Sequence, residues 1–421
     1  MKDNKLPLAE ILLLVGGLAA IVALQTIFRR PAFFDEDDYL ANVALLHHYG
    51  FGKQYLTSLA GSAGPLYSMV HFLFEPLTHL QALYIRWVNA GFLIGTTCNI
   101  YFTLRLLNPQ NRFYTLYVMA IPMTYTVGGL ALTEMPAMFF FSAAIYFLLS
   151  STIRYSNSGR LLQLILAGCC MSLAIMGRQP YLLTLTTIPL LFTWKQSWRN
   201  NILPLLLILA CSLALPGYVF AAWEGLVPTI ESHLYQDIAD AGVFFRVDFF
   251  LLCVFYLAIS ILLIAPGFFR LTHDRRSLVK WAACAAVSLA TNFIFKWIAI
   301  LPVQTLMQKI FVSAEVRKAA GLVCGSAVIF SSLYFGACLY RQLQRFQYRK
   351  EMTFFAAACL VLAVSCGKIT TGFSSMYAAQ AIPPLVLLGS FFYRPSKYNP
   401  LGIALGMITG LLSLASYFTQ P

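Results

Sequence analysis

The stretch LPLAEILLLVGGLAAIVALQTIF, residues 6–28, decides the fold class of this chain. It is apolar over a length that crosses the ~30 Å hydrocarbon core of a bilayer as a helix of about 20 residues. The run is too long for the apolar region of a signal peptide, and no small-residue cleavage site precedes Arg29. The sequence therefore predicts a retained first transmembrane helix.

The rest of the chain has the composition of a membrane protein. Of its 421 residues, 59% are hydrophobic and 11% are charged, whereas soluble domains carry about 25% charged residues. Its apolar runs are unbroken, unlike the alternating strands of a membrane barrel, so the sequence predicts an all-α polytopic protein with about 11–13 transmembrane helices. No internal repeat or separate soluble domain is evident, and we interpret residues 1–421 as a single transmembrane domain. The predicted spans lie near residues 7–28, 81–105, 113–128, 135–153, 161–177, 181–193, 201–222, 249–269, 281–300, 318–340, 352–366, 379–393 and 400–418.

The chain carries a net charge of +13, and the distribution of its basic residues predicts its orientation in the membrane. With a cytoplasmic N-terminus, most Lys and Arg residues fall in cytoplasmic loops, including RLTHDRRSLVK at 270–280 and RQLQRFQYRK at 341–350. This is the positive-inside pattern, and it places the basic excess against anionic lipid. A nucleic-acid partner is therefore not predicted. The ten cysteines lie in or beside apolar runs without CxxC spacing, so no disulfide or zinc site is assigned.

Two outer loops are long. Residues 29–80 contain turn residues and the amphipathic stretch PLYSMVHFLFEPLTHLQAL, which predicts short helices lying in the membrane interface. Residues 223–248 form a second, smaller outer loop with the same interpretation.

The first outer loop opens with FFDEDDYL, residues 33–40, the densest charge cluster in the chain. Three interpretations stay open: a solvated loop start, a general base whose pKa is raised by a neighbouring carboxylate, or a site for a divalent cation. Consecutive residues of a helix point in different directions, so Asp35, Glu36, Asp37 and Asp38 cannot all serve one site.

Other polar residues stand at predicted span ends. Glu134, in GGLALTEMPAMFF, either belongs to a helix cap with Thr133 or joins an active site from a second loop. Arg178, in AIMGRQPYLL, either extends to the interface or binds a phosphate beside a helix break. Lys368, in SCGKITTGFSSMYAAQ, has the same two interpretations, and Arg246 is a further outer basic residue. The Gly-Pro turn in GSAGPLYSMVH, residues 61–71, can return the loop to the acid cluster.

Soluble-enzyme fingerprints are missing from the sequence. It contains no Ser-His-Asp arrangement, HExxH or GxGxxG motif, and the GKIT at Lys368 lacks the upstream glycine of a P-loop. A membrane-embedded donor therefore fits better than a soluble nucleotide sugar. No cofactor is required and no metal ligands are assigned, because the histidines lack tight ligand spacing; the outer carboxylates are compatible with a divalent cation.

Together these features resemble the glycosyltransferase-C superfamily, integral membrane enzymes that use polyprenyl-phosphate sugars. The local motifs look most like the dolichyl-phosphate-glucose α-1,2-glucosyltransferase branch: Asp35-Glu36 match its DE, Gly64-Pro65-Leu66-Tyr67 its turn, and Arg178-Gln179 its RQ. LTEMPA around Glu134 is similar to an acid-bearing loop of such enzymes. The longer downstream motifs of the eukaryotic enzyme and N-x-Ser/Thr sequons are absent, and the compactness of the chain favours a bacterial relative.

The resemblance implies an inverting transfer of a hexose from a polyprenyl-phosphate sugar to a lipid-linked or glycan acceptor on the outer face. Asp35 is the first choice for the general base and Glu36 the second, with Glu134 as a further catalytic acid. The donor phosphate would be bound by Arg178, Lys368 and Arg246. The substrate-binding candidates are Asp38, Tyr67, Gln179 and Tyr377. The expected location is the bacterial inner membrane, or the endoplasmic reticulum membrane in a eukaryote.

Two other functions remain as alternatives. A transporter or flippase of a lipid-linked sugar would favour paired charges at mid-membrane and internal repeats; Lys296, in TNFIFKWIAI, is a clearly intramembrane charge by this prediction. An O-antigen ligase or polymerase would rely on Arg and His in a large late outer loop, whereas here the early acidic loop is the larger.

Overall fold

A computed structural model describes residues 8–33, 35–61, 63–153, 157–192, 198–228, 245–269, 275–300, 313–346, 349–368, 372–394 and 399–419. All regular secondary structure in these ranges is helical, which confirms the predicted all-α class. Eight of the described helices are long and apolar enough to cross a membrane. They are α1 (Leu8–Ile27), α5 (Ala82–Leu107), α7 (Glu134–Ile153), α8 (Asn157–Gly177), α11 (Trp198–Trp223), α13 (Val247–Ile264), α16 (Ala314–Arg345) and α20 (Asn399–Phe418). The protein is therefore an integral, multi-pass membrane protein.

Several other predicted spans are shorter or broken, and prolines explain most of the breaks. The predicted span 113–128 folds as a 3₁₀ helix and a short α-helix that separate at Pro122, and the span 181–193 divides into three short helices between Pro180 and Phe192. Proline lacks the N–H that a continuous helix needs. The further helical elements are η1 (Pro109–Ala120), α6 (Met123–Gly129), α9 (Tyr181–Thr184), η2 (Leu185–Thr187), α10 (Pro189–Phe192), η4 (Pro266–Phe269), α14 (Arg275–Phe295), α17 (Lys350–Cys366), which covers the predicted span 352–366, α18 (Ser375–Ala379) and α19 (Ile382–Ser390).

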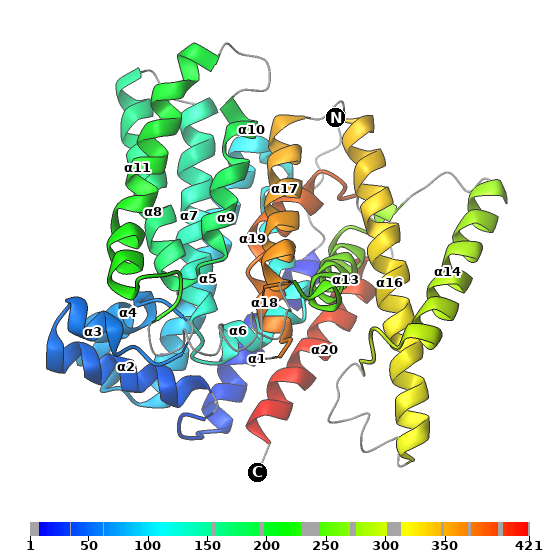
Figure 1. The fold of residues 1–421 in the computed structure, drawn as a ribbon, viewed down its shortest axis with the longest axis horizontal. Coiled ribbons are helices and arrows are strands. Elements are labelled where there is room, and N and C mark those ends of the chain that lie inside the picture. The colour runs from blue at the N-terminus through cyan, green and yellow to red at the C-terminus, as the bar shows by residue number, and fades with distance from the viewer. Residues whose placement is uncertain are drawn as a thin grey trace.

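The first predicted outer loop folds into three helices that lie across one end of the bundle. They are α2 (Asp35–Tyr49), α3 (Lys53–Thr57) and α4 (Leu66–Thr78), and they cross below the upright α7, α8 and α11 (Figure 1). One side of α4 packs inward, while Leu73 and Leu77 are each 74% exposed. A helix lying along a membrane surface has this apolar outer side. Of the second predicted loop, residues 229–244 lie outside the described residues.

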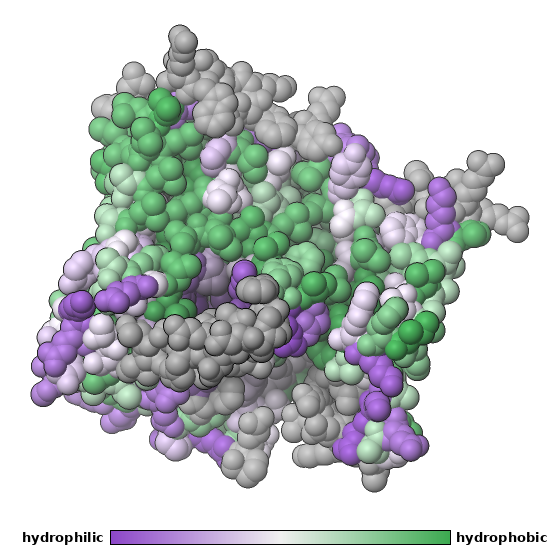
Figure 2. Space-filling model, viewed as in Figure 1, coloured by the Kyte–Doolittle hydropathy of each residue, from purple (hydrophilic) through white to green (hydrophobic). Residues whose placement is uncertain are grey.

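The bundle packs through small residues. A Cβ on Gly168 of α8 would overlap Cys211 of α11, and one on Gly406 of α20 would overlap the carbonyl of Ala120. Close backbone approach of this kind is how membrane helices associate, because lipid tails remove the hydrophobic driving force between them. Figure 2 shows the outcome: a broad apolar surface over α7, α8, α11 and α17, with hydrophilic side chains gathered below around α2 and α3.

One helical hairpin stands at the edge of the molecule. Helix α14 packs on α16 and lies apart from the central helices (Figure 1). The buried Asn292 side chain closes its end, donating to the carbonyls of Ile298 and Leu322 at 2.8 Å each. Helix α14 ends at Phe295, so the predicted span 281–300 is too long, and Lys296 lies exposed just beyond the helix.

Candidate active site

Three segments that are distant in sequence meet at the end of the bundle that carries α2–α4. Asp35 is the first residue of α2, Glu134 is the first residue of α7, and Arg178 directly follows α8. Glu134 and Arg178 form an ion pair, and their side chains are 1% and 8% exposed. Removing an ion pair from water is costly unless its geometry and other hydrogen bonds compensate, so a buried pair at a helix end is a candidate functional group.

The glycines beside this pair bring the three segments close together. A side chain on Gly64 would overlap the carbonyl of Met176, and one on Gly177 would overlap Ala137 of α7 and Leu66 of α4. The Gly-Pro turn of the first loop therefore packs directly against the last residues of α8, immediately before Arg178. This agrees with the prediction that the turn returns the loop to the site.

Asp35 is half-buried beside the ion pair. Burial is the main cause that raises the pKa of its carboxyl; the Glu134 charge adds to the shift, while Arg178 opposes it and Asp38 contributes last. A carboxylate with a raised pKa in this position can accept a proton from a hydroxyl group. Tyr39 lies one turn later on α2, near enough to interact electrostatically with Arg178, Glu134 and Asp35, and its buried phenol has a raised pKa.

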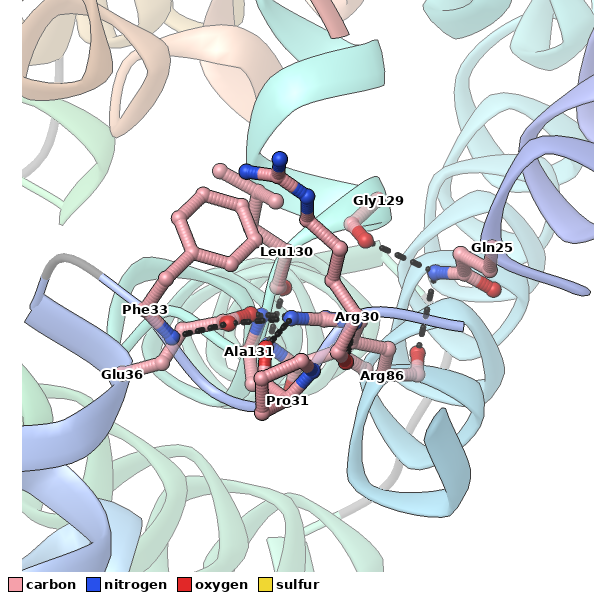
Figure 3. Close-up of polar contacts among 10 residues, drawn as sticks. Gln25, Arg30, Pro31, Phe33, Glu36, Arg86, Gly129, Leu130 and Ala131 are labelled. Atoms are coloured by element: carbon pink, nitrogen blue, oxygen red, sulfur yellow. Dashed lines mark hydrogen bonds and ion pairs between the residues drawn. The ribbon is translucent and has the colours of Figure 1, made fainter. Parts of the chain in front are cut away.

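Glu36, the second choice for the base, is engaged in a structural network instead (Figure 3). Its carboxylate accepts from Arg86 Nε at 3.0 Å and from Nη2 at 2.6 Å, and it accepts the Ala131 N–H at 2.7 Å. Arg86 also donates to the carbonyls of Arg30 and Pro31 at 2.9 and 3.0 Å. With both partners enclosed and bonded, Glu36 holds the start of α2 against α5.

The same network fixes the segment that leads into Glu134. Asn89 of α5 donates to the carbonyls of Leu130 and Leu132 at 2.9 Å each. Gln25 of α1 donates to the Gly129 carbonyl at 2.9 Å (Figure 3). Together with Glu36, these side chains connect α1, α2 and α5 to the turn before α7. Asp35 and Glu134 therefore hold a defined mutual position.

Two predicted phosphate-binding residues lie on adjoining segments. The Arg246 N–H donates to the Gly367 carbonyl at 2.7 Å, which brings Arg246 next to the segment that carries Lys368. The Arg246 guanidinium is bidentate to Asp248, at 3.0 and 2.7 Å, and lies 4.0 Å from the Phe249 ring centroid. Lys368 is exposed. Their phosphate-binding role stays a prediction.

The predicted substrate-binding residues lie in different environments. Asp38 is exposed and Gln179 is half-buried directly after Arg178. Tyr377 of α18 is half-buried and close enough to Arg178 for an electrostatic interaction. Tyr67 is 2% exposed, its ring contacts those of Tyr39 and His71, and its hydroxyl has no hydrogen-bond partner among the described residues. Tyr67 therefore packs behind the residues that line the site and is not exposed at its surface.

Sequence reasoning did not identify Arg86, Asn89 and Tyr39. A signal was available for the first two, because an Arg and an Asn three residues apart in YIRWVNAG share one face of an otherwise apolar span. Tyr39 follows Asp35 by four residues and so shares its helix face. Among the described residues, no group of three or more His, Cys, Asp or Glu side chains is arranged to hold a metal ion.

Comparison with protein-family models and with curated proteins finds no match. Among solved structures, the chain is similar to ArnT from Cupriavidus metallidurans bound to undecaprenyl phosphate, with 14% identity over 96% of this chain and 76% of that chain, at a TM-score of 0.47. The apo state of the same protein gives 14% identity over 94% and 76%, at 0.45. The S. cerevisiae protein O-mannosyltransferase Pmt1-Pmt2 complex bound to the sugar donor gives 19% identity over 53% of this chain, at 0.37. This chain spans 34% of the length of that yeast chain.

Proposed function

We propose that this protein is an inverting glycosyltransferase that moves a hexose from a polyprenyl-phosphate sugar to a hydroxyl of a lipid-linked or glycan acceptor. The observation that carries the proposal is the meeting of Asp35, Glu134 and Arg178 at one end of a membrane bundle. Each of the three comes from a motif that resembles the glycosyltransferase-C superfamily. A half-buried carboxylate next to a buried guanidinium suits a reaction that removes a proton and releases a phosphate.

In this mechanism the Asp35 carboxylate accepts the proton of the acceptor hydroxyl. The freed oxygen attacks the anomeric carbon while the bond from that carbon to the phosphate oxygen breaks. A single displacement inverts the anomeric configuration and releases polyprenyl phosphate. Arg178 stabilises the negative charge that develops on the leaving phosphate, and its Nε has no partner among the described residues.

Glu134 and Tyr39 act as positioning residues in this proposal. Glu134 holds the Arg178 side chain at the site, and the Thr133 hydroxyl donates to its carboxylate at 3.4 Å. Its charge also raises the pKa of Asp35 and so makes that carboxylate a better proton acceptor. Tyr39 keeps a neutral hydroxyl among the three charges.

The placement of the buried ion pairs favours transfer over transport. Among the described residues, the two buried pairs, Glu36–Arg86 and Glu134–Arg178, lie at or near helix ends on the same side of the bundle. A transporter places its paired charges near mid-membrane. The proposed location is the outer face of a bacterial inner membrane, with the N-terminus in the cytoplasm.

The test uses purified protein in nanodiscs with a panel of radiolabelled polyprenyl-phosphate hexoses and a cognate membrane extract as acceptor. We expect Asp35→Asn to lower transfer by about 10²–10⁴-fold, the usual contribution of a general base. Asp37→Asn is the matched control, because Asp37 belongs to the same acidic cluster but is exposed to solvent. Retained transfer in a folded Asp35→Asn protein, or no transfer by wild type from any donor, would contradict the proposal.

A further inference from the structure

Among the buried polar atoms that have no hydrogen-bond partner in the described residues are Arg178 Nε and the side-chain oxygen of Gln380. Gln380 is 2% exposed. A buried polar atom without a partner costs about 1–3 kcal/mol, and such atoms are exceptions in native proteins that call for an explanation. One explanation is a ligand group that is bonded to them in the working protein.

Gln380 is connected to the candidate site through Tyr181. It directly follows α18, and its backbone carbonyl accepts a hydrogen bond from the Tyr181 hydroxyl at 3.0 Å. Tyr181 in turn lies close enough to Glu134 and Arg178 to interact with both electrostatically. Tyr377, three residues before Gln380, also interacts with Arg178. The end of α18 therefore borders the site on its Arg178 side.

The two unpaired atoms need opposite partners. Arg178 Nε carries a hydrogen and needs an acceptor, which a phosphate oxygen supplies. The amide oxygen of Gln380 needs a donor, which an ionised phosphate lacks and a sugar hydroxyl supplies. A sugar phosphate carries both groups next to each other. We infer that the Gln380 side chain accepts a hydrogen bond from a hydroxyl of the donor's sugar ring and so selects the sugar; this inference rests on the proposed function.

The test compares a polyprenyl-phosphate hexose with its single-deoxy analogues, using kcat/KM for transfer. Wild type is expected to prefer the parent sugar at one ring position by about tenfold to a hundredfold, because the analogue leaves the amide oxygen unpaired. Gln380→Leu removes the acceptor and should use the parent and that analogue with similar efficiency. Gln380→Glu keeps an acceptor oxygen in a side chain of the same shape and should retain the preference.

Gln342→Leu is the matched control. Gln342 is also a buried glutamine, but its amide donates to the Phe268 carbonyl at 2.8 Å in another part of the bundle. We expect this variant to lose stability and to keep the sugar preference. A Gln380→Leu protein that still prefers the parent sugar would overturn the inference. So would a change confined to deoxy acceptors, which would assign the hydroxyl to the acceptor.

Donor binding measured by calorimetry separates this inference from the proposed function, because it needs no turnover. Wild type should bind the parent donor more tightly than the critical deoxy donor, and Gln380→Leu should bind both alike. If wild type binds both donors equally, the inference about Gln380 fails even when transfer is observed. If binding discriminates but no sugar is transferred, the inference stands and the proposed reaction fails.

Discussion

At the scale of single residues, two adjacent acids lie in different environments. Asp35 lies beside Glu134 and Arg178, while Glu36 is enclosed with Arg86. Successive residues of a helix point about 100° apart, so this divergence follows from helix geometry. The sequence predicted a functional acid in this cluster. Choosing between Asp35 and Glu36 required the position of α5, which carries Arg86 and which no local sequence pattern reveals.

Replacing Asp35 should stabilise the protein while it removes activity. Because burial raises the folded-state pKa of Asp35, the folded protein holds this proton more tightly than the unfolded chain does. The stability that this carboxyl contributes is therefore lost as pH rises through its folded pKa. We expect the thermal midpoint of Asp35→Asn to exceed that of wild type by more at pH 7 than at pH 4. A variant less stable than wild type at both values would contradict this.

Replacing Glu36 should unfold the site. Glu36→Gln leaves the fully buried Arg86 without its counter-charge, and breaking a buried pair in this way costs about 3–5 kcal/mol. We expect a thermal midpoint in detergent well below that of wild type. The neighbouring substitution Asp37→Asn should leave the midpoint nearly unchanged, and equal midpoints for the two variants would show that Glu36 has no such role.

His71 gives a pH signature of its own. Both of its ring nitrogens are buried without a partner among the described residues, and burial lowers the pKa of this histidine to about 3. The unfolded chain therefore binds the proton first as pH falls from about 6.5 toward 3, and wild type loses up to about 1.4 kcal/mol per pH unit in that range. His71→Phe should lose less stability over the same range, as thermal unfolding at several pH values would show. Parallel pH profiles would contradict the neutral, buried state of His71.

At the scale of elements, the site depends on how close the first loop comes to α8. The sequence contained the turn, and its glycine and proline predicted a fixed conformation. It did not reveal that Gly64 touches the Met176 backbone, because that contact depends on the register of helices joined through more than a hundred residues. For the same reason, the broken helices after Pro122 and Pro180 were predicted as spans, although the prolines marked the breaks.

Gly64→Ala tests this junction. Its methyl group would overlap a backbone carbonyl, so the turn or α8 has to move. We expect transfer to fall by at least about tenfold, since a displacement of about 1 Å near a reaction centre costs up to about a hundredfold. Gly52→Ala is the control, because a Cβ there meets no atom within 4 Å. Equal activity of the two variants would show that the close contact at Gly64 does not position the site.

At the scale of the whole molecule, packing is uneven. Helix α7 lies between α5 and α8, and about two thirds of its span (67%) is buried. Helix α14 packs on α16 at the edge (Figure 1). Composition alone predicted a polytopic all-α protein correctly, because apolar length is a local property. Which helices are central was not predictable, because it depends on contacts between distant segments.

Hydrogen exchange in detergent micelles should reveal this difference. Helix α14 has one main packing partner, so its amides should exchange earlier than those of α7, which opens only with the central bundle. The substitution Asn292→Ala should accelerate amide exchange in α14 further, because it removes the side-chain hydrogen bonds to the carbonyls of Ile298 and Leu322. Similar protection of α7 and α14 would contradict this account of the packing.

On the proposed function, the Glu134–Arg178 pair also selects which anions can bind at the site. Any anion that approaches the guanidinium competes with a carboxylate that is already there. Dissolved inorganic phosphate or chloride competes with the Glu134 carboxylate for Arg178 through its charge alone. On the proposed function, a lipid-linked donor is already held in the membrane by its prenyl chain, so it meets the site at a higher local concentration than a dissolved anion does. If the proposed function is correct, the ion pair therefore favours an anion that arrives through the membrane over the abundant small anions of the surroundings.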